Sequence, residues 1–355
     1  MARASWIIRV TVFCMVVGHA GAGTIEAVVW QNGGVAALGA GPLSEAFAVN
    51  QSGDIAGEWV IGSSEHAFLF RSGTLTDLGQ WSARGINNAD QVVGGDGDHA
   101  FLWNQNAINV LPAFGTDTSA FAFGINNAGQ IVGLSFSSAN DQLTSSHALL
   151  WEGNTVTDLG HLPGDFGAVA LAINSHGDIV GYSIGPTFGR TPVIWHDGII
   201  AEIPSCPYGR YHCFADANAI NDLGDVAGDL FYFSGGTAVG LPGDGYGVNE
   251  FGLVAGTSYD YDLVPTAFLW QDGISTHLAA LPGSHGRPQS AAFALNNNGH
   301  VVGYSDAADP VPESSTSVLL FTGLLVLGWG NFVSGGIKLS GSGPLKTAPK
   351  YRIGG

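Results

Sequence analysis

One ten-residue pattern recurs seven times along the chain, and it constrains the fold more than any other feature. Each copy has an aliphatic residue, an asparagine and a turn-forming stretch, and it ends in two small or aliphatic residues and a glycine. The copies occupy residues 48–57, 85–94, 124–133, 172–181, 219–228, 247–256 and 294–303. The asparagines of the seven copies are Asn50, Asn87, Asn126, Asn174, Asn221, Asn249 and Asn296. Successive asparagines are 37, 39, 48, 47, 28 and 47 residues apart. Recurrence at this period indicates a repeat architecture.

A second pattern alternates with the first, also seven times. It starts with a short run ending in an aromatic residue, continues through a glycine-containing turn, and ends in a run closed by Leu-Gly, Leu-Pro or a similar pair. Clear copies lie at residues 67–79, 100–111, 148–160 and 267–281, and weaker copies at 27–39, 193–204 and 231–242. Short β-branched or aromatic runs around three to five turn residues predict a β-hairpin for both patterns.

The two hairpins together predict the fold class. Two hairpins per repeat make a four-stranded antiparallel sheet of about 40 residues, and a ring of such sheets protects its edges by radial repetition. We therefore expect an all-β, seven-bladed β-propeller over residues 24–309, with six or eight blades as the alternatives. The competing architecture, a stacked β-helix, has shorter and more even repeats. An aromatic hairpin could share its blade with the preceding or the following asparagine hairpin. In the first case, residues near 27–38 and 295–304 would form one closing sheet.

Composition excludes some partners of this predicted ring. Charged residues make up 11% of the chain, against about 25% in an average domain. Between residues 24 and 309 there are five arginines, no lysine and 28 acidic residues, which leaves a net charge of −23. Binding to a phosphate backbone needs clusters of Lys and Arg. The sequence therefore excludes nucleic acid as a partner.

The N-terminus predicts export. Two arginines precede an apolar run at residues 10–17, and Ala-Gly-Ala follows at 20–22, which together are typical of a cleaved signal peptide over residues 1–22. An N-terminal anchor is the alternative, but the run is too short to span a bilayer. With Cys14 removed, two cysteines remain, and we expect a disulfide between Cys206 and Cys213. A zinc pair with His212 is the alternative reading.

The C-terminus resembles a bacterial sorting signal. Val311, Pro312, Glu313 and Ser314 precede an uncharged apolar run at residues 318–333, and basic residues follow. This block resembles the PEP-CTERM signal of Gram-negative bacteria. The resemblance implies that residues 310–334 hold the motif and a transmembrane sorting helix, which an exosortase-type enzyme would process. We expect residues 335–355 to form a disordered tail. Contact with the membrane would then be made only through that helix, before processing.

The aromatic hairpins carry a second resemblance. His66-Ala-Phe68, His99-Ala-Phe101 and the variant His147-Ala-Leu149 each precede a turn rich in asparagine and a Val-Gly ending. This recurrence resembles the HAF extracellular repeat family. The family implies a secreted repeat protein found with surface-sorting signals, and it implies no known reaction.

Residues that suggest chemistry mostly belong to the repeat. Ser183, in a Gly-x-Ser-x-Gly pattern, would need a strand-to-helix turn to act as a nucleophile, and no helix is expected. The three histidines open equivalent strands of different blades, which a ring keeps apart. Asp96 with Asp98 and Asp260 with Asp262 leave a weak surface calcium site open, although calcium takes six to eight oxygen ligands. We predict no catalytic residue, no metal ligand and no cofactor.

These patterns predict an exported protein of a Gram-negative cell surface or extracellular matrix. It would act as a non-catalytic scaffold or ligand-binding module, and its partners would be an exosortase, extracellular polysaccharide or a surface protein. The recurrent asparagines would serve the fold, since a reaction centre is not copied seven times. The alternative is a secreted propeller enzyme, a polysaccharide hydrolase or lyase.

Overall fold

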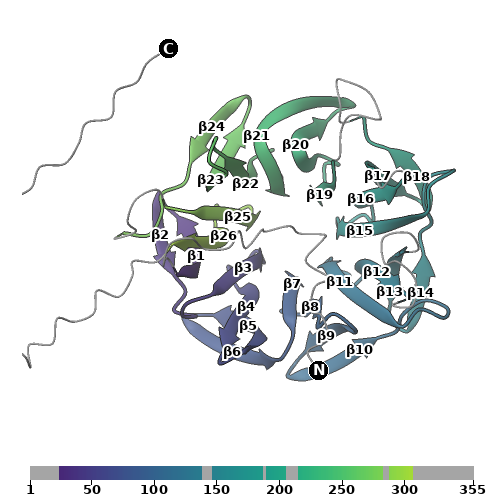
Figure 1. The fold of residues 1–355 in the computed structure, drawn as a ribbon, viewed down its shortest axis with the longest axis horizontal. Helices are drawn as coiled ribbons and strands as arrows, with labels where there is room; N and C mark the ends of the chain where they lie inside the picture. The colour runs from purple at the N-terminus through teal and green to yellow at the C-terminus, as the bar shows by residue number, and fades with distance from the viewer. Residues whose placement is uncertain (1–23, 138–145, 187–188, 205–214, 283–287, 307–355) are drawn as a thin grey trace, which may run out of the picture. The chain divides into compact units, whose positions relative to one another are not determined.

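A computed structural model describes residues 24–137, 146–186, 189–204, 215–282 and 288–306. All of them belong to the first of two units, Met1–Asp309 and Pro310–Gly355. The described residues form 26 strands in six sheets around a central axis (Figure 1). The chain is thus an all-β propeller, six-bladed when counted by its sheets. No helix suited to crossing a membrane occurs in these ranges.

Four of the sheets hold one asparagine hairpin followed by one aromatic hairpin, with strands in chain order. The first is β3 (Ser44–Val49), β4 (Ile55–Ile61), β5 (Ser64–Arg71) and β6 (Thr74–Gly79). The second is β7 (Ser82–Ile86), β8 (Val92–Gly95), β9 (Ala100–Asn104) and β10 (Ala107–Leu111). The third is β11 (Ser119–Ile125), β12 (Ile131–Phe136), β13 (His147–Glu152) and β14 (Thr155–Asp158). The fourth is β15 (Gly167–Ile173), β16 (Ile179–Ile184), β17 (Arg190–His196) and β18 (Ile199–Glu202).

The closing sheet joins the two ends of the ring. Its strands are β25 (Ser290–Leu295), β26 (Val301–Asp306), β1 (Ile25–Gln31) and β2 (Gly34–Ala37). β1 pairs antiparallel with β26, from Ile25 opposite Asp306 to Trp30 opposite Val301. Each aromatic hairpin therefore shares its sheet with the preceding asparagine hairpin, which decides the open question of blade phase.

The prediction of seven separate four-stranded sheets is wrong, because the fifth and sixth repeats share one sheet. Its six strands are β19 (Ala217–Ile220), β20 (Val226–Ser234), β21 (Thr237–Val248), β22 (Val254–Tyr259), β23 (Pro265–Gln271) and β24 (Ile274–His277). Only two residues separate Gly228 from Phe231, whereas eleven separate the equivalent Gly256 and Phe268. No room is left for a hairpin loop, and β20 continues through this point. β21 then pairs with β20 at its start and with β22 at its end.

The glycine that ends each asparagine hairpin is required by close packing. A Cβ atom built on these seven glycines would lie only 1.8–2.3 Å from a backbone oxygen of the paired inner strand, as at Gly133 against Phe121. Opposite this contact, each inner strand carries a β-bulge. A bulge adds one residue and redirects its side chain. The extra residue lies three positions before the asparagine in every repeat.

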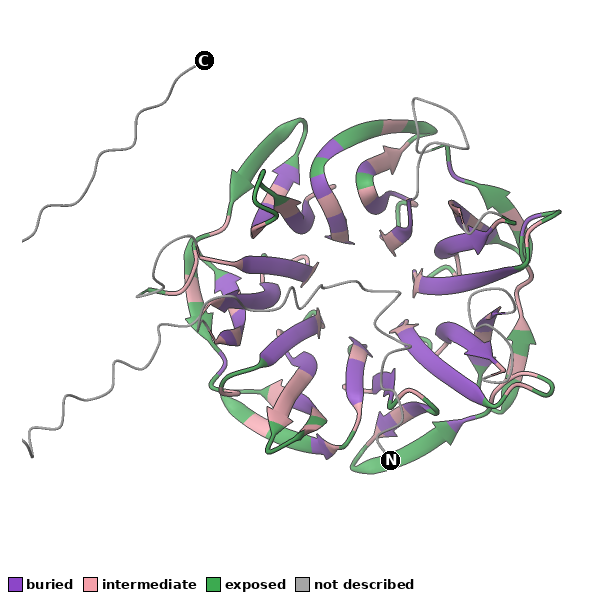
Figure 2. Cartoon of the chain, in the orientation of Figure 1, coloured by how far each residue is buried: buried purple, intermediate pink, exposed green. Residues whose placement is uncertain are grey.

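Residues near the centre of the ring are more buried than residues at its outer edge. Inner strands are mostly buried and outermost strands mostly exposed (Figure 2). Tryptophans of the third strands pack between neighbouring sheets, as Trp151 does with residues of the second sheet. Its indole Nε1 donates to the Pro112 carbonyl at 2.8 Å. A buried tryptophan contributes a large apolar area and needs such an acceptor. These contacts fix the sheets around the axis and so position the asparagine turns.

Candidate functional site: the mouth of the central channel

The seven recurrent asparagines meet around the central axis, one from each repeat, and all are at least 95% buried. Each one first shapes its own turn. In Asn87, for example, Oδ1 accepts from the backbone N–H groups of Ala89 and Gln91, both at 3.0 Å. The amide nitrogen then donates to the Gln91 side chain at 2.7 Å. A side-chain amide suits the position because it offers two acceptor lone pairs and two donors.

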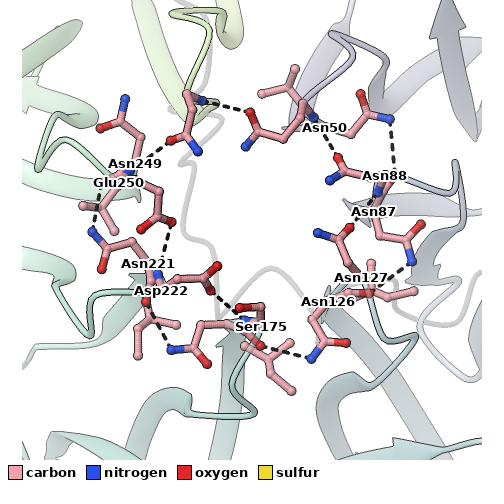
Figure 3. Close-up of a pocket in the computed structure, with 18 of the residues that line it drawn as sticks. Asn50, Asn87, Asn88, Asn126, Asn127, Ser175, Asn221, Asp222, Asn249 and Glu250 are labelled. Carbon is pink, nitrogen blue, oxygen red and sulfur yellow. Dashed lines mark hydrogen bonds between the residues drawn. The ribbon is translucent and has the colours of Figure 1, made fainter.

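The remaining donor of each amide links one repeat to the next. Nδ2 of Asn50 donates to the backbone carbonyl of Asn87 at 3.2 Å, and Asn87 donates in the same way to Asn126 at 3.1 Å. The links continue through Asn174, Asn221, Asn249 and Asn296 and return to Asn50. Seven asparagines therefore form a closed ring of hydrogen bonds, although the strands form six sheets. Figure 3 shows part of this ring, with Asn50, Asn87 and Asn126 on one side and Asn221 and Asn249 on the other.

The residues that follow the asparagines form a second ring, which we call the rim: Gln51, Asn88, Asn127, Ser175, Asp222, Glu250 and Asn297. The backbone N–H of one rim residue donates to the side-chain oxygen of the next, as from Gln51 to Asn88 at 2.9 Å. Six such links are made in all. The rim therefore holds its side chains in fixed positions around the mouth.

The mouth encloses a cavity of about 180 Å³. It is lined by the rim, by every ring asparagine except Asn296, and by seven aliphatic residues: Val49, Ile86, Ile125, Ile173, Ile220, Val248 and Leu295. Drug-sized ligands fill pockets of roughly 300–1,000 Å³. The space is therefore suited to one small polar ring or to the end of a chain.

The rim is chemically uneven. Five of its members are neutral, whereas the fifth and sixth repeats contribute the carboxylates of Asp222 and Glu250. The next residue in each of those turns is apolar and exposed: Leu223 is 70% and Phe251 66% exposed. Two carboxylates therefore lie next to each other in the rim, and an exposed apolar side chain follows each of them in its turn.

Each bulged residue lies three positions before a ring asparagine, on the strand that leads into the asparagine turn. The bulged residues are Phe47, Arg84, Phe123, Leu171, Asn218, Tyr246 and Phe293. The guanidinium of Arg84 lies 3.8 Å from the ring centroid of Phe47, whose ring is 5.2 Å from that of Phe293. Tyr246 continues this contact at 5.7 Å from Phe293. The recurrent bulge thus builds an arc of contacting side chains, tilted or edge-on to one another, across four repeats.

A buried acidic cluster lies at the other end of the inner strands, where the fifth and sixth repeats meet. Arg190 donates to Asp216 Oδ2 at 2.6 Å, and Asn218 donates to Asp229 Oδ1 at 2.8 Å. Asp229 faces Asp244 across the β20–β21 pair. Among the residues that the structure describes, Oδ1 of Asp216 is buried without a hydrogen-bond partner.

Burial changes the acidity of this cluster. Burial and the charge of Asp229 together raise the pKa of Asp216 to about 7, against the attraction of Arg190. Burial and the same neighbouring charge raise the pKa of Asp244 to about 7. The pKa of Asp229 is also raised by burial. A carboxyl group that keeps its proton near neutral pH can act as a hydrogen-bond donor or an acid.

The other predicted residues are placed as follows. Ser183 lies within β16 and donates to Asp165 Oδ2 at 2.6 Å, so it occupies no strand-to-helix turn. The histidines pair with separate carboxylates: His66 with Asp77, His99 with Asp96 and His147 with Asp117. Within the described ranges, no three His, Cys, Asp or Glu side chains are arranged to hold a metal ion. The predicted disulfide of Cys206 and Cys213 lies outside the described residues, as do the signal peptide and residues 311–314.

Sequence reasoning missed both the rim and the acidic cluster. The rim residues directly follow the recurrent asparagines, so their position could have been found, but their residue types differ between repeats. The cluster had one available signal, the 28-residue spacing between Asn221 and Asn249. That shortened repeat brings Asp229 opposite Asp244.

Comparison with known proteins gives no family. No family model and no curated protein matches the chain. Among solved structures, TolB from Acinetobacter baumannii is 9% identical with a TM-score of 0.42, and the match covers 80% of this chain and 64% of TolB. A gluconolactonase from Xanthomonas campestris is 12% identical with a TM-score of 0.42, covering 75% and 87%. A puromycin-hydrolyzing peptidase from Mycobacterium tuberculosis is 13% identical with a TM-score of 0.36, covering 73% and 60%. The chain thus spans under two thirds of the TolB and peptidase chains.

Proposed function

We propose that this protein is an exported, non-catalytic saccharide-binding module that holds one end or unit of a polysaccharide in the mouth of its channel. The observation that carries the proposal is the rim, with amides and carboxylates around a small cavity. Sugar hydroxyls are both donors and acceptors, and these side chains complement them. Phe251, beside Glu250, offers an aromatic face for the apolar face of a sugar ring.

The sequence supports a location outside the cell for this binding activity. The N-terminal run favours export, the block at residues 311–333 resembles a PEP-CTERM signal, and the repeats resemble the HAF extracellular family. We place the protein at the surface or in the extracellular matrix of a Gram-negative bacterium, after sorting by an exosortase-type enzyme. By its repeats the propeller is sevenfold, with the fifth and sixth repeats merged into one sheet.

A glycan array probed with the full-length protein tests the proposal. We expect specific binding to saccharides, and we expect Phe251→Ala to weaken it at least tenfold. Tyr261→Ala is the matched control, because Tyr261 is fully exposed in the β22–β23 turn, at the opposite end of β22 from the asparagine turn. Absence of saccharide binding, or equal losses in both variants, would reject the proposal.

The acidic cluster favours one second candidate, polysaccharide cleavage. A carboxyl group with a pKa of about 7, as at Asp244, is suited to general acid catalysis near neutral pH. Release of reducing ends from an exopolysaccharide by the full-length protein, and its loss in Asp244→Asn, would establish this activity. Intact polysaccharide after prolonged incubation would reject it.

A further inference from the structure

The rim has one break, between the third and fourth repeats. Six backbone N–H groups of the rim donate to the next side-chain oxygen, but the N–H of Asn127 has no acceptor among the described residues. The next rim residue is Ser175, whose own N–H donates to Asp222 Oδ1 at 2.8 Å. Asn127 and Ser175 are both exposed at the mouth. The break therefore leaves an open donor beside a carboxylate.

The break follows from side-chain length. At the other six rim positions the residue is Asn, Gln, Asp or Glu, whose carbonyl or carboxylate oxygen reaches the N–H of the preceding repeat. The serine hydroxyl oxygen is bonded directly to Cβ and is one bond shorter than an asparagine oxygen. A backbone N–H is a strong donor that is normally paired. A bound molecule that supplies an oxygen at this point would complete the rim.

We propose that the break between Asn127 and Ser175 is the subsite that orients the saccharide, an inference that rests on the proposed function. One sugar hydroxyl oxygen accepts from the Asn127 N–H and lies against the Ser175 hydroxyl. The neighbouring hydroxyl donates to the carboxylate of Asp222. The ligand is therefore a neutral saccharide with two adjacent hydroxyls.

The negative charge around the subsite favours a neutral sugar over an acidic one. The subsite lies beside Asp222 and Glu250, and the ring carries a net charge of −23 between residues 24 and 309. The carboxylate of a uronic acid would be repelled there, whereas a hydroxyl would be bound. Like charges brought together in a partly enclosed site disfavour binding.

Closing the break with a longer side chain tests the inference. Ser175→Asn in the full-length protein supplies the missing acceptor, so we expect a higher Tm and at least tenfold weaker binding of the neutral saccharide found on the array. Ser175→Ala removes the hydroxyl but keeps the break open, so we expect it to bind the saccharide more tightly than Ser175→Asn does. Tyr261→Ala, in the exposed turn between β22 and β23, is the control and should keep the affinity within threefold of the wild type.

The outcomes separate this inference from the proposed function. If wild type binds a saccharide and Ser175→Asn binds it equally, the subsite is rejected and the proposed function stands. A preference for uronic acids over neutral sugars also rejects the subsite. If wild type binds no saccharide, both are rejected. Ser175→Asp, which supplies the same acceptor, repeats the test if Ser175→Asn fails to fold.

Discussion

The side-chain amide of Asn296 donates to the backbone carbonyl of Asn50 at 2.8 Å, across 246 residues of sequence. This bond is the seventh link of the asparagine ring, and it lies beside the sheet in which β1 pairs with β26. The first and last repeats are thus joined twice, by strands and by side chains. The mouth of the channel depends on this closure, because every rim residue directly follows a ring asparagine.

The asparagine ring predicts that no other residue type can replace its members without loss of stability. Asn174 accepts from the N–H groups of His176 and Asp178 and donates to the carbonyl of Asn221 at 3.1 Å. Asn174→Ala leaves buried partners unpaired, so we expect a loss of about 2–4 kcal/mol in the free energy of unfolding. Urea denaturation at pH 7 measures it, and a loss below about 0.5 kcal/mol, within the usual range of surface substitutions, contradicts the assigned role.

The same position predicts a pH signature. Asn174→Asp keeps both acceptor contacts but loses the donors and places a carboxyl group beside Asp178 Oδ2, which is 3.0 Å from the present amide. Burial and that neighbour should raise the pKa of the new carboxyl group in the folded state. The folded state then holds its proton more tightly, and the loss relative to wild type grows as pH rises above about 4. A loss that shrinks as pH rises would contradict this.

The acidic cluster predicts that the wild-type protein becomes less stable as pH rises toward neutrality. Asp216 and Asp244 have a pKa of about 7 in the folded protein and an ordinary value of 3.8. Between these values the folded state binds more protons than the unfolded state, so the free energy of unfolding falls as pH rises from about 4 to 7. Above about pH 7 this contribution is constant. We expect Asp244→Asn to flatten the decline and to raise stability at pH 8.

Thermal unfolding measured from pH 4 to pH 8 checks the cluster. Asp272→Asn, in an exposed turn between β23 and β24, is the control and should leave the profile unchanged. Parallel profiles for wild type and Asp244→Asn would show that Asp244 does not cause the decline.

Arg190 is predicted to matter far more than Arg71, although both pair with a carboxylate at 2.6 Å. The Arg190 pair is buried, so Arg190→Gln leaves Asp216 uncompensated and should cost about 3–5 kcal/mol. Half-exposed Arg71 pairs with Asp90, and Arg71→Gln should cost under about 1 kcal/mol. Denaturant titration of the two variants at pH 8 compares them, and similar losses would contradict the difference in burial.

The recurrent glycine is predicted to admit no side chain. Gly133→Ala would place a Cβ atom 2.0 Å from the Phe121 carbonyl oxygen, whereas nothing lies within 4 Å of a Cβ atom at Gly240. Backbone cannot shift as a flexible side chain can, so we expect Gly133→Ala to cost about 3 kcal/mol or more, at or above the usual overpacking cost. Gly240→Ala should change stability by under about 1 kcal/mol. Equal Tm values for the two variants would contradict the close approach.

The sequence predicted what all repeats share. An asparagine equivalent to Asn126 recurs because every turn needs its side-chain amide. A glycine equivalent to Gly133 recurs because the backbone of the paired inner strand approaches it too closely for a side chain. The hairpins and the ring architecture could be predicted from these two residue types. The number of sheets did not follow. It depends on the two residues between Gly228 and Phe231, and counting motifs cannot reveal that this interval is too short for a loop.

The candidate site lies in what the repeats do not share. Ser175 occupies a rim position that holds Asn, Gln, Asp or Glu in the other repeats. The missing hydrogen bond that results is recognised only once the structure places Ser175 next to Asn127. Asp216 directly precedes β19, whereas Asp229 and Asp244 lie in β20 and β21, and burial is the main cause of their raised pKa values. Repetition therefore predicts the frame of a propeller, and departures from repetition mark the residues that need a three-dimensional structure.

Hydrogen exchange of the full-length protein, measured with and without the neutral saccharide selected on the array, tests the central claim most directly. Saccharide bound in the mouth should slow exchange at the rim turns, most of all at the Asn127 amide, and leave the outermost strands such as β10 unchanged. Slowed exchange confined to the outer strands or to the far face, with the Asn127 amide unaffected, would contradict a binding site at the mouth of the channel.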